Sequence, residues 1–89
     1  MSNENLKLKV AKEAVKLVKD GMVVGLGTGS TAALFIRELG NRIKEEELTV
    51  FGIPTSFEAK MLAMQYEIPL VTLDEYDVDI AFDGADEVE

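Results

Sequence analysis

Three glycines and three hydroxyl side chains follow a short apolar run in the first half of this chain. Residues 22–31 read Met-Val-Val-Gly-Leu-Gly-Thr-Gly-Ser-Thr, which predicts a strand, a glycine-rich turn and a helix start. Glycine leaves backbone N–H groups uncovered, and the first N–H groups of a helix lack intrahelical acceptors and lie at the positive end of its dipole. We therefore predict a loop that binds an anion, with phosphate as the best fit. Its residues are Thr28, Gly29, Ser30 and Thr31. The alternative is a tight turn that needs small residues for packing, and the three hydroxyls disfavour it.

A second group of polar residues follows another apolar run, residues 78–82. The segment reads Asp83-Gly84-Ala85-Asp86-Glu87. Two carboxylates at the mouth of a parallel sheet can accept hydrogen bonds from sugar hydroxyls, and each can shift the proton affinity of the other. The alternative is a helix N-cap beside a solvated acid. No third ligand of clear spacing accompanies the pair, so we expect no metal.

Lys7 occupies an unusual place in the first predicted helix, residues 3–19. One face of this helix carries apolar residues, and we expect that face to be buried. Lys7 lies within the apolar arc, whereas the other lysines of the helix lie opposite. Its stem could pack while its ammonium group reaches water, or the side chain could point at a site at the edge of the core. The expected buried residues are Leu6, Val10, Ala14, Leu17 and Val18.

Strand and helix patterns alternate along the chain. Alternation with apolar strands predicts one α/β unit, residues 1–89, with a parallel sheet covered on both faces and a ligand beyond the carboxyl ends of the strands. The second helix should bury Ala32, Phe35, Ile36, Leu39 and Ile43, and the third should bury Phe57, Met61 and Met64. The predicted elements are a helix over 3–19 ended by Gly21, strand 22–26, helix 30–44, strand 48–53, a helix capped near Ser56, strand 70–73 and strand 78–82.

The composition excludes several classes of function. The chain has 9 basic and 17 acidic residues, a net charge of −8, and neither histidine nor cysteine. This balance disfavours nucleic acid, which needs a basic surface. No run approaches the length of a membrane span, and no signal sequence is evident. We therefore expect a cytoplasmic protein without a membrane or nucleic-acid partner.

Two common nucleotide-binding motifs fit the glycine loop poorly. Ser30 stands where the dinucleotide fingerprint has its third glycine, and no acidic residue ends the second predicted strand. The loop also lacks the lysine of a Walker A motif. Nucleotide binding is therefore disfavoured.

The two loops together indicate one protein family more specifically than either loop does alone. Three features matter here: the segment Gly-Leu-Gly-Thr-Gly-Ser-Thr-Ala, the later segment Asp-Gly-Ala-Asp-Glu, and Leu6-Lys7 in the first helix. With these features the chain resembles the A-type ribose-5-phosphate isomerase family over essentially all 89 residues. The resemblance implies a Rossmann-like three-layer sandwich with a mostly parallel sheet, of which these residues form the N-terminal part. It also implies an enzyme of the pentose phosphate pathway that interconverts ribose 5-phosphate and ribulose 5-phosphate through a cis-enediolate, without metal or organic cofactor.

The same resemblance assigns roles to individual residues. Asp83 and Asp86 would take supporting catalytic roles by orienting the sugar hydroxyls. The implied substrate-binding residues are Lys7, Thr28, Gly29, Ser30, Thr31, Asp83, Gly84, Ala85 and Asp86.

The chain also departs from the family pattern. A Lys-Gly-Gly-Gly segment and the glutamate that serves as base are expected beyond Glu89, and neither occurs in the sequence. Family members are more than twice as long and form homo-oligomers, so we expect this chain to be a piece of a longer one and inactive alone. Two alternatives stay open: a non-catalytic fragment that binds a sugar phosphate, and a protein like the amino-sugar-phosphate deaminases, for which a histidine would be expected.

Overall fold

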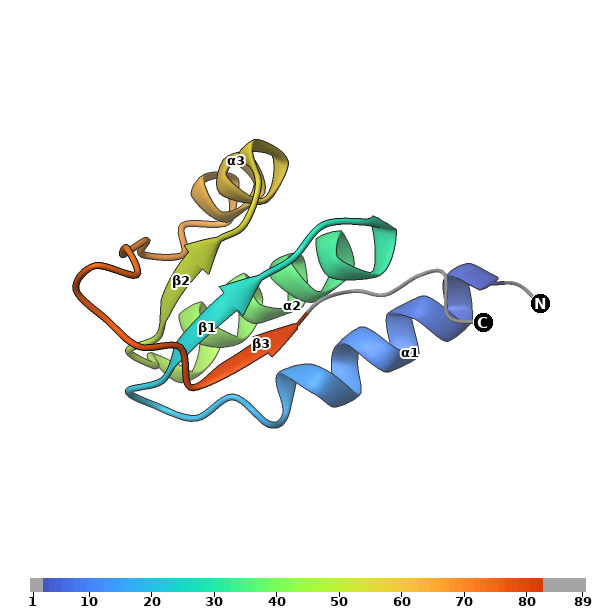
Figure 1. Ribbon diagram of the computed structural model, residues 1–89. Coiled ribbons are helices and arrows are strands. Elements are labelled where there is room, and N and C mark those ends of the chain that lie inside the picture. The colour runs from blue at the N-terminus through green and yellow to red at the C-terminus, as the bar shows by residue number, and fades with distance from the viewer. Residues whose placement is uncertain (1–2, 83–89) are drawn as a thin grey trace.

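The computed structural model describes residues 3–82, in which helices and strands alternate (Figure 1). The predicted order of elements is confirmed, with boundaries shifted by a few residues, except that Leu70 forms only an isolated bridge to Gly52 in place of strand 70–73. The elements are α1 Asn3–Val15, β1 Val23–Leu26, α2 Ser30–Glu46, β2 Phe51–Pro54, α3 Phe57–Gln65 and β3 Ile80–Phe82.

The three strands form one parallel sheet in the order β2-β1-β3. Leu26 at the end of β1 pairs with Pro54 on one side and with Phe82 on the other. This register brings the carboxyl ends of all three strands to one edge of the sheet. The segments that follow β1, β2 and β3 therefore begin next to one another, as the sequence predicted.

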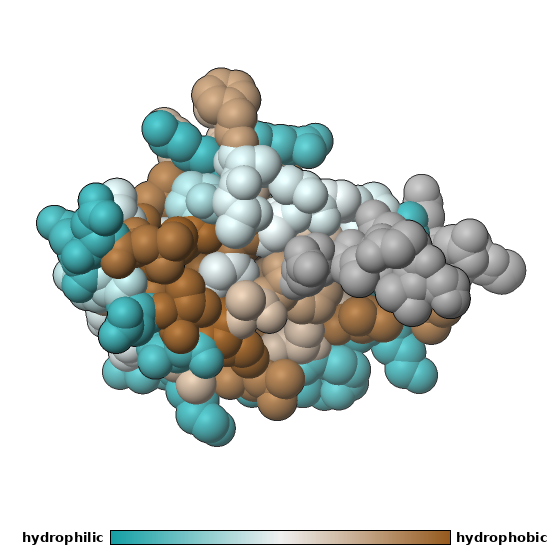
Figure 2. Space-filling model, viewed as in Figure 1, coloured by the Kyte–Doolittle hydropathy of each residue, from teal (hydrophilic) through white to brown (hydrophobic). Residues whose placement is uncertain are grey.

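All three helices contribute to a single core on one face of the sheet, and α2 passes behind the strands in Figure 1. The α/β class with a parallel sheet is confirmed, but within residues 3–82 no helix covers the second face. The reason is topological. The chain crosses the sheet in the same direction after β1 and after β2, and α2 and α3 form these two crossovers. Right-handed crossovers in the same direction place both helices on the same face of the sheet. Apolar side chains gather on the face turned toward the viewer in Figure 2. The core is formed mainly by Ala11, Val15, Val18, Val24, Leu26, Phe35, Ile36, Leu39, Val50, Ala59, Ala63 and Ile68.

The first helix is shorter than predicted and buries a different stripe. It ends at Val15, and the next N–H groups make tighter bonds three residues back, as from Leu17 N to Ala14 O at 3.0 Å. Gly21, with φ +89°, lies in the connection to β1 and does not cap the helix. The stripe Ala11, Val15 and Val18 is buried, Ala14 is half-buried, and Leu6, Val10 and Leu17 are exposed. The predicted buried face was therefore wrong for these three, because α1 packs chiefly against α2 and needs only a narrow stripe.

The second helix matches its prediction: Ala32, Phe35, Ile36 and Leu39 are buried, and Ile43 packs half-buried against the core.

The third helix buries small residues in place of the large ones expected. Ala59 and Ala63 face the core, whereas Phe57, Met61 and Met64 are 75%, 49% and 56% exposed. The small residues permit close packing of this helix, since buried contacts in proteins leave little free volume. The predicted cap is confirmed, because Ser56 Oγ accepts a hydrogen bond from Ala59 N at 3.0 Å.

Candidate functional site

Backbone hydrogen bonds tie the ends of the strands together at the predicted ligand edge. Thr55, directly after β2, donates to Leu26 O from its N–H at 3.0 Å and from its hydroxyl at 2.8 Å. Gly27 N donates to Phe82 O at 2.9 Å. The glycine loop is therefore fixed on both sides, at the start of α2.

The glycine loop leaves the N-terminus of α2 without a side-chain cap. Gly29 is the N-cap residue, with φ 101° and ψ 169°, a conformation that favours glycine. Thr28 and Ser30 are exposed, whereas Thr31 is buried. The first N–H groups of α2 and two hydroxyls thus lie at one exposed helix end, where an anion is favoured electrostatically.

The other glycines of the motif have different roles. Gly25 lies within β1, and a Cβ there would lie 3.2 Å from the Cβ of Ala81, so this glycine permits close approach of β3. Among the described residues only Gly21 and Gly29 are glycines with positive φ. Of the motif's three glycines, therefore, only Gly29 needs glycine's backbone freedom.

Lys7 reaches the glycine loop from α1. Its Nζ donates to Ser30 Oγ at 2.6 Å, across 23 residues of sequence. The half-buried stem packs while the ammonium group contacts the loop. The structure therefore brings Lys7 and the predicted anion-binding loop together, and the binding role of Lys7 stays a prediction.

A groove with a volume of about 420 Å³ runs between α1 and α2 at this end of the molecule. It holds two cationic side chains, Lys7 and Arg37, and the described residues that line it include no carboxylate. Arg37 also contacts the neighbouring Glu38 at 3.2 Å, on a partly exposed surface. The groove is therefore suited to an anionic ligand. Its lining residues are Asn5, Lys7, Leu8, Ser30, Ala33, Leu34 and Arg37.

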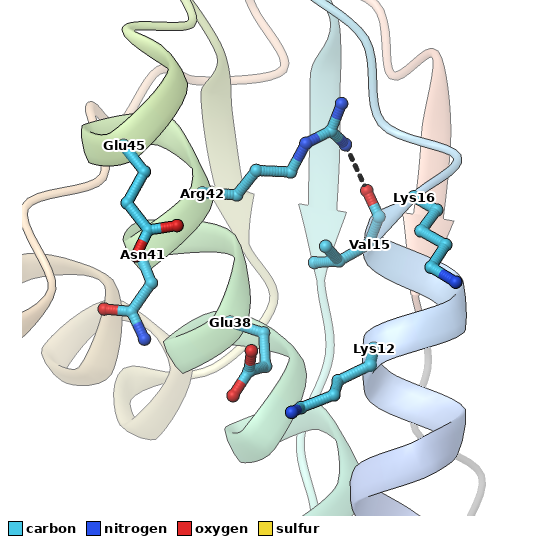
Figure 3. Close-up of a pocket in the computed structure, with 7 residues that line it drawn as sticks. All are labelled: Lys12, Val15, Lys16, Glu38, Asn41, Arg42 and Glu45. Atoms are coloured by element: carbon cyan, nitrogen blue, oxygen red, sulfur yellow. Dashed lines mark hydrogen bonds between the residues drawn. The ribbon is translucent and has the colours of Figure 1, made fainter.

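Arg42 joins the two helices at the opposite end of this helix pair (Figure 3). It extends from α2 and one of its terminal nitrogens donates to the carbonyl oxygens of Val15 and Val18, where α1 ends. Its Nε donates to Glu46 at 3.2 Å. A cation at a helix C-terminus satisfies carbonyls that lack intrahelical donors. Together, Lys7 and Arg42 fix α1 on α2 at both ends.

Asp79 is a second polar residue that sequence analysis missed. Its carboxylate accepts a hydrogen bond from Val23 N, and its own N–H donates to Val23 O, both at 2.8 Å. These two bonds fix the start of β3 against the start of β1. Nothing in the local sequence distinguished Asp79 or Arg42 from the surrounding charged residues.

The acidic pair lies outside the described residues. Asp83, Gly84, Ala85 and Asp86 follow β3 directly in the sequence, and the structure describes the chain only as far as Phe82. Over residues 3–82 there is no group of three or more histidine, cysteine or acidic residues arranged to hold a metal ion. Within the same range, no helix is both long and apolar enough to cross a membrane.

Comparison with known proteins gives one consistent family. The model of the family "Ribose 5-phosphate isomerase A (phosphoriboisomerase A)" matches residues 51–89. The ribose-5-phosphate isomerase A of Methanocaldococcus jannaschii is 97% identical over the whole chain, which covers 39% of that protein. The chain thus spans less than two-fifths of the length of this relative.

Solved structures agree with the sequence match. The structure of ribose 5-phosphate isomerase A from Methanocaldococcus jannaschii superimposes with a TM-score of 0.90 at 96% identity, over 92% of this chain and 36% of that one. A second structure, of a D-ribose-5-phosphate isomerase in complex with phospho-erythronic acid, gives a TM-score of 0.89 at 48% identity, over 93% of this chain and 37% of that one. The Rossmann-like fold is confirmed, and over its whole length this chain is similar to part of ribose-5-phosphate isomerase A.

Proposed function

We propose that this chain carries the sugar-phosphate-binding loops of a ribose-5-phosphate isomerase, an aldose–ketose isomerase of the pentose phosphate pathway. The observation that carries the proposal is the contact of Lys7 Nζ with Ser30 Oγ at the uncapped N-terminus of α2. A cation, a hydroxyl and the N-terminal backbone N–H groups of α2 lie together there at one exposed helix end. These are the groups that bind a phosphate monoester.

In this proposal the phosphate lies at residues 28–31, and Lys7 moves from Ser30 onto a phosphate oxygen or bridges the two. The sugar chain then extends along the carboxyl edge of the sheet toward the segment that follows Phe82. Asp83 and Asp86 begin that segment and would accept hydrogen bonds from the sugar hydroxyls and assist ring opening. Gly84 and Ala85 would let the backbone approach the sugar closely.

The reaction that this site would serve is an internal proton transfer. A base removes the proton from C2 of the aldose, a cis-enediolate forms, and the proton returns to C1 to give the ketose. The described residues that line the groove include no base, and the family resemblance assigns the base to a glutamate that follows a Lys-Gly-Gly-Gly segment. The structural relative in complex with phospho-erythronic acid supports an anionic, phosphorylated ligand for this chain.

Further parts of the proposal concern the cellular setting. We assign the chain to the cytoplasm, where its phosphorylated substrate is found, and to a homo-oligomer when it forms part of the complete enzyme. Its net charge of −8 supports a small-molecule ligand over nucleic acid.

A titration with ribose 5-phosphate tests the proposal. Amide signals of residues 28–31 should shift on addition of ribose 5-phosphate, shift less with inorganic phosphate, and stay unchanged with ribose. Lys7→Ala should weaken binding about tenfold or more, which corresponds to the loss of one charge-assisted contact. Lys9→Ala is the matched control, because Lys9 lies on the same helix but outside the groove.

Three results would contradict this assignment. Signals of residues 28–31 could stay unchanged while other loops respond, ribose could bind as well as its phosphate, or Lys7→Ala and Lys9→Ala could have equal effects. Each would move the anion site away from the N-terminus of α2.

A further inference from the structure

Arg37 lies at the far end of the groove that begins at Lys7 and Ser30. Ser30 and Arg37 both belong to α2, and both line this groove. Their separation in sequence corresponds to almost two helical turns, so the two residues lie on the same face of α2, about 10 Å apart along its axis. The groove therefore holds one cationic group near each end, with Lys7 bonded to Ser30 at one end and Arg37 at the other.

The walls between the two cations are uncharged. Leu8 of α1 and Ala33 and Leu34 of α2 line the groove and are half-buried. Leu34 also packs against the core, which fixes this wall. Contact with such walls favours an uncharged chain, because it removes apolar surface from water. A charged group in the middle of the ligand would lose water there without gaining a partner.

The guanidinium group of Arg37 keeps N–H donors for a ligand. Its contact with Glu38 at 3.2 Å uses Nη2, and a guanidinium group offers further donors in a planar fork that matches a phosphate. The side chain of Arg37 is 40% exposed, and ion pairs at such a surface contribute little to stability. A phosphate can therefore join or replace Glu38 at Arg37 at little cost.

The neighbouring groove between α1 and α2 provides a contrast (Figure 3). Its cations are accompanied by two carboxylates, Glu38 and Glu45. The guanidinium group of Arg42 already donates to backbone carbonyl oxygens at the end of α1. Carboxylates repel an anion, and a guanidinium group bonded to the backbone is less available to one. Of these two grooves, the one that contains Arg37 is therefore the better site for an anion.

We propose that the groove of Lys7 and Arg37 binds an elongated compound that has a phosphate at each end and an uncharged chain between them. One phosphate lies beside Lys7 at residues 28–31, and for that end the inference rests on the proposed function. The other phosphate accepts two hydrogen bonds from Arg37. The separation of about 10 Å along α2 is comparable to an extended five-carbon chain with a phosphate at each end. Such a compound competes with ribose 5-phosphate for residues 28–31.

Pentane-1,5-diyl bisphosphate tests the proposal, with pentyl phosphate as the matched compound that has a single phosphate. Each is titrated into the 89-residue chain and followed by calorimetry and by amide signals. The bisphosphate should bind about tenfold or more tightly than pentyl phosphate, which corresponds to one added bidentate contact between charged groups. Both compounds should shift the signals of residues 28–31, and the bisphosphate should also shift the Nε signal of Arg37.

A shorter bisphosphate separates reach from charge. Ethane-1,2-diyl bisphosphate carries the same two phosphates on a chain that is too short to span the groove. It should bind no more than about threefold more tightly than pentyl phosphate. Equal binding of the short and the long bisphosphate would show that charge alone determines affinity and would overturn the proposal.

Variants of α2 locate the second phosphate. Arg37→Ala should lower the ratio of the two affinities, bisphosphate over pentyl phosphate, from about tenfold to about twofold or less. Arg37→Lys keeps the charge but loses the planar fork, so its ratio should be intermediate. Lys44→Ala is the matched control, because Lys44 is an exposed cation of α2 that does not line the groove, and it should leave the ratio unchanged. Circular dichroism checks that each variant is folded, and Arg37→Lys replaces Arg37→Ala if the latter is not.

The outcomes separate this inference from the proposed function. Equal affinities for the bisphosphate and pentyl phosphate, or equal effects of the Arg37 and Lys44 variants on their ratio, would overturn the inference. The proposed function stands in that case if pentyl phosphate still shifts residues 28–31. If neither compound shifts residues 28–31, the anion site of the proposed function is wrong, and the inference is wrong with it.

Discussion

The rings of Phe35 and Phe82 stack face to face, with centroids 4.5 Å apart and an interplanar angle of 9°. Phe35 lies in α2, about one turn after the anion-binding loop, and Phe82 is the last residue of β3. The stack therefore links the helix that begins at the glycine loop to the strand that leads to Asp83. Together with the hydrogen bond from Gly27 N to Phe82 O, this stack fixes the end of β3 beside the glycine loop.

Truncation of Phe35 should destabilise the fold strongly. Its side chain is 2% exposed and packs in the core, so Phe35→Ala should lower the free energy of unfolding by about 3–5 kcal/mol. Urea unfolding followed by circular dichroism measures the change. Phe57→Ala is the control, because Phe57 is 75% exposed and its loss should change stability by less than about 0.5 kcal/mol. Similar losses for both variants would contradict the packing described for α2.

Substitution of Gly40 should be unfavourable although it lies in a helix. Alanine normally stabilises a helix interior by about 1 kcal/mol relative to glycine. Here an added Cβ would lie 2.7 Å from the Cβ of Tyr66 and 2.9 Å from its carbonyl oxygen. We expect Gly40→Ala to lower the free energy of unfolding by about 1–3 kcal/mol, as overpacking does. In the same urea assay, Asn41→Ala on the exposed side of α2 should have almost no effect. A stabilised Gly40→Ala would show that α3 can move away from α2 at little cost.

Arg42 should matter more for stability than the neighbouring Arg37. Arg42→Ala leaves the Val15 and Val18 carbonyls without their donor, and we expect a loss of about 2–3 kcal/mol. Arg37→Ala removes a partly exposed contact with Glu38 and should cost less than about 1 kcal/mol. Hydrogen exchange should accelerate first in the last turn of α1 in the Arg42 variant. Equal exchange of α1 in both variants would show that Arg42 does not hold the end of this helix.

The sequence was sufficient to predict the order of the elements and the glycine loop, because apolar runs, glycines and a serine cap are local signals. It was insufficient to predict the buried side of α1 and α3. Both helices are apolar on more than one side, so periodicity could not decide between Ala59 and Phe57, or between Ala11 and Leu6. That choice depends on how closely each helix approaches α2, which is a property of tertiary packing.

The candidate site also contains residues that the local sequence predicts and residues that it does not. The place of residues 28–31 at the start of α2 could be predicted from the glycines and hydroxyls of the sequence, and the contact of Lys7 with Ser30 agrees with its unusual wheel position. Their role in binding stays a prediction. The roles of Arg42 and Asp79 could not be predicted, because each binds backbone groups of a segment distant in sequence. A charged residue that binds a remote backbone has no signature in its own neighbourhood.

The 89-residue chain by itself should not isomerise ribose 5-phosphate at an enzymatic rate. A positioned general base contributes about 10²–10⁴-fold, and a donor to a developing oxyanion contributes about 10²–10³-fold. Among residues 3–82, the groove beside Lys7 and Ser30 has no carboxylate in its described lining, and the Lys-Gly-Gly-Gly segment that precedes the base in the family does not occur in the sequence. Asp83 and Asp86 would then bind hydroxyls of the sugar, but no base would lie beside the carbon that loses its proton. A coupled assay for ribulose 5-phosphate measures the rate, with Asp83→Asn as the control variant. Turnover that co-purifies with the chain and disappears in Asp83→Asn would instead assign the proton transfer to the acidic loop itself.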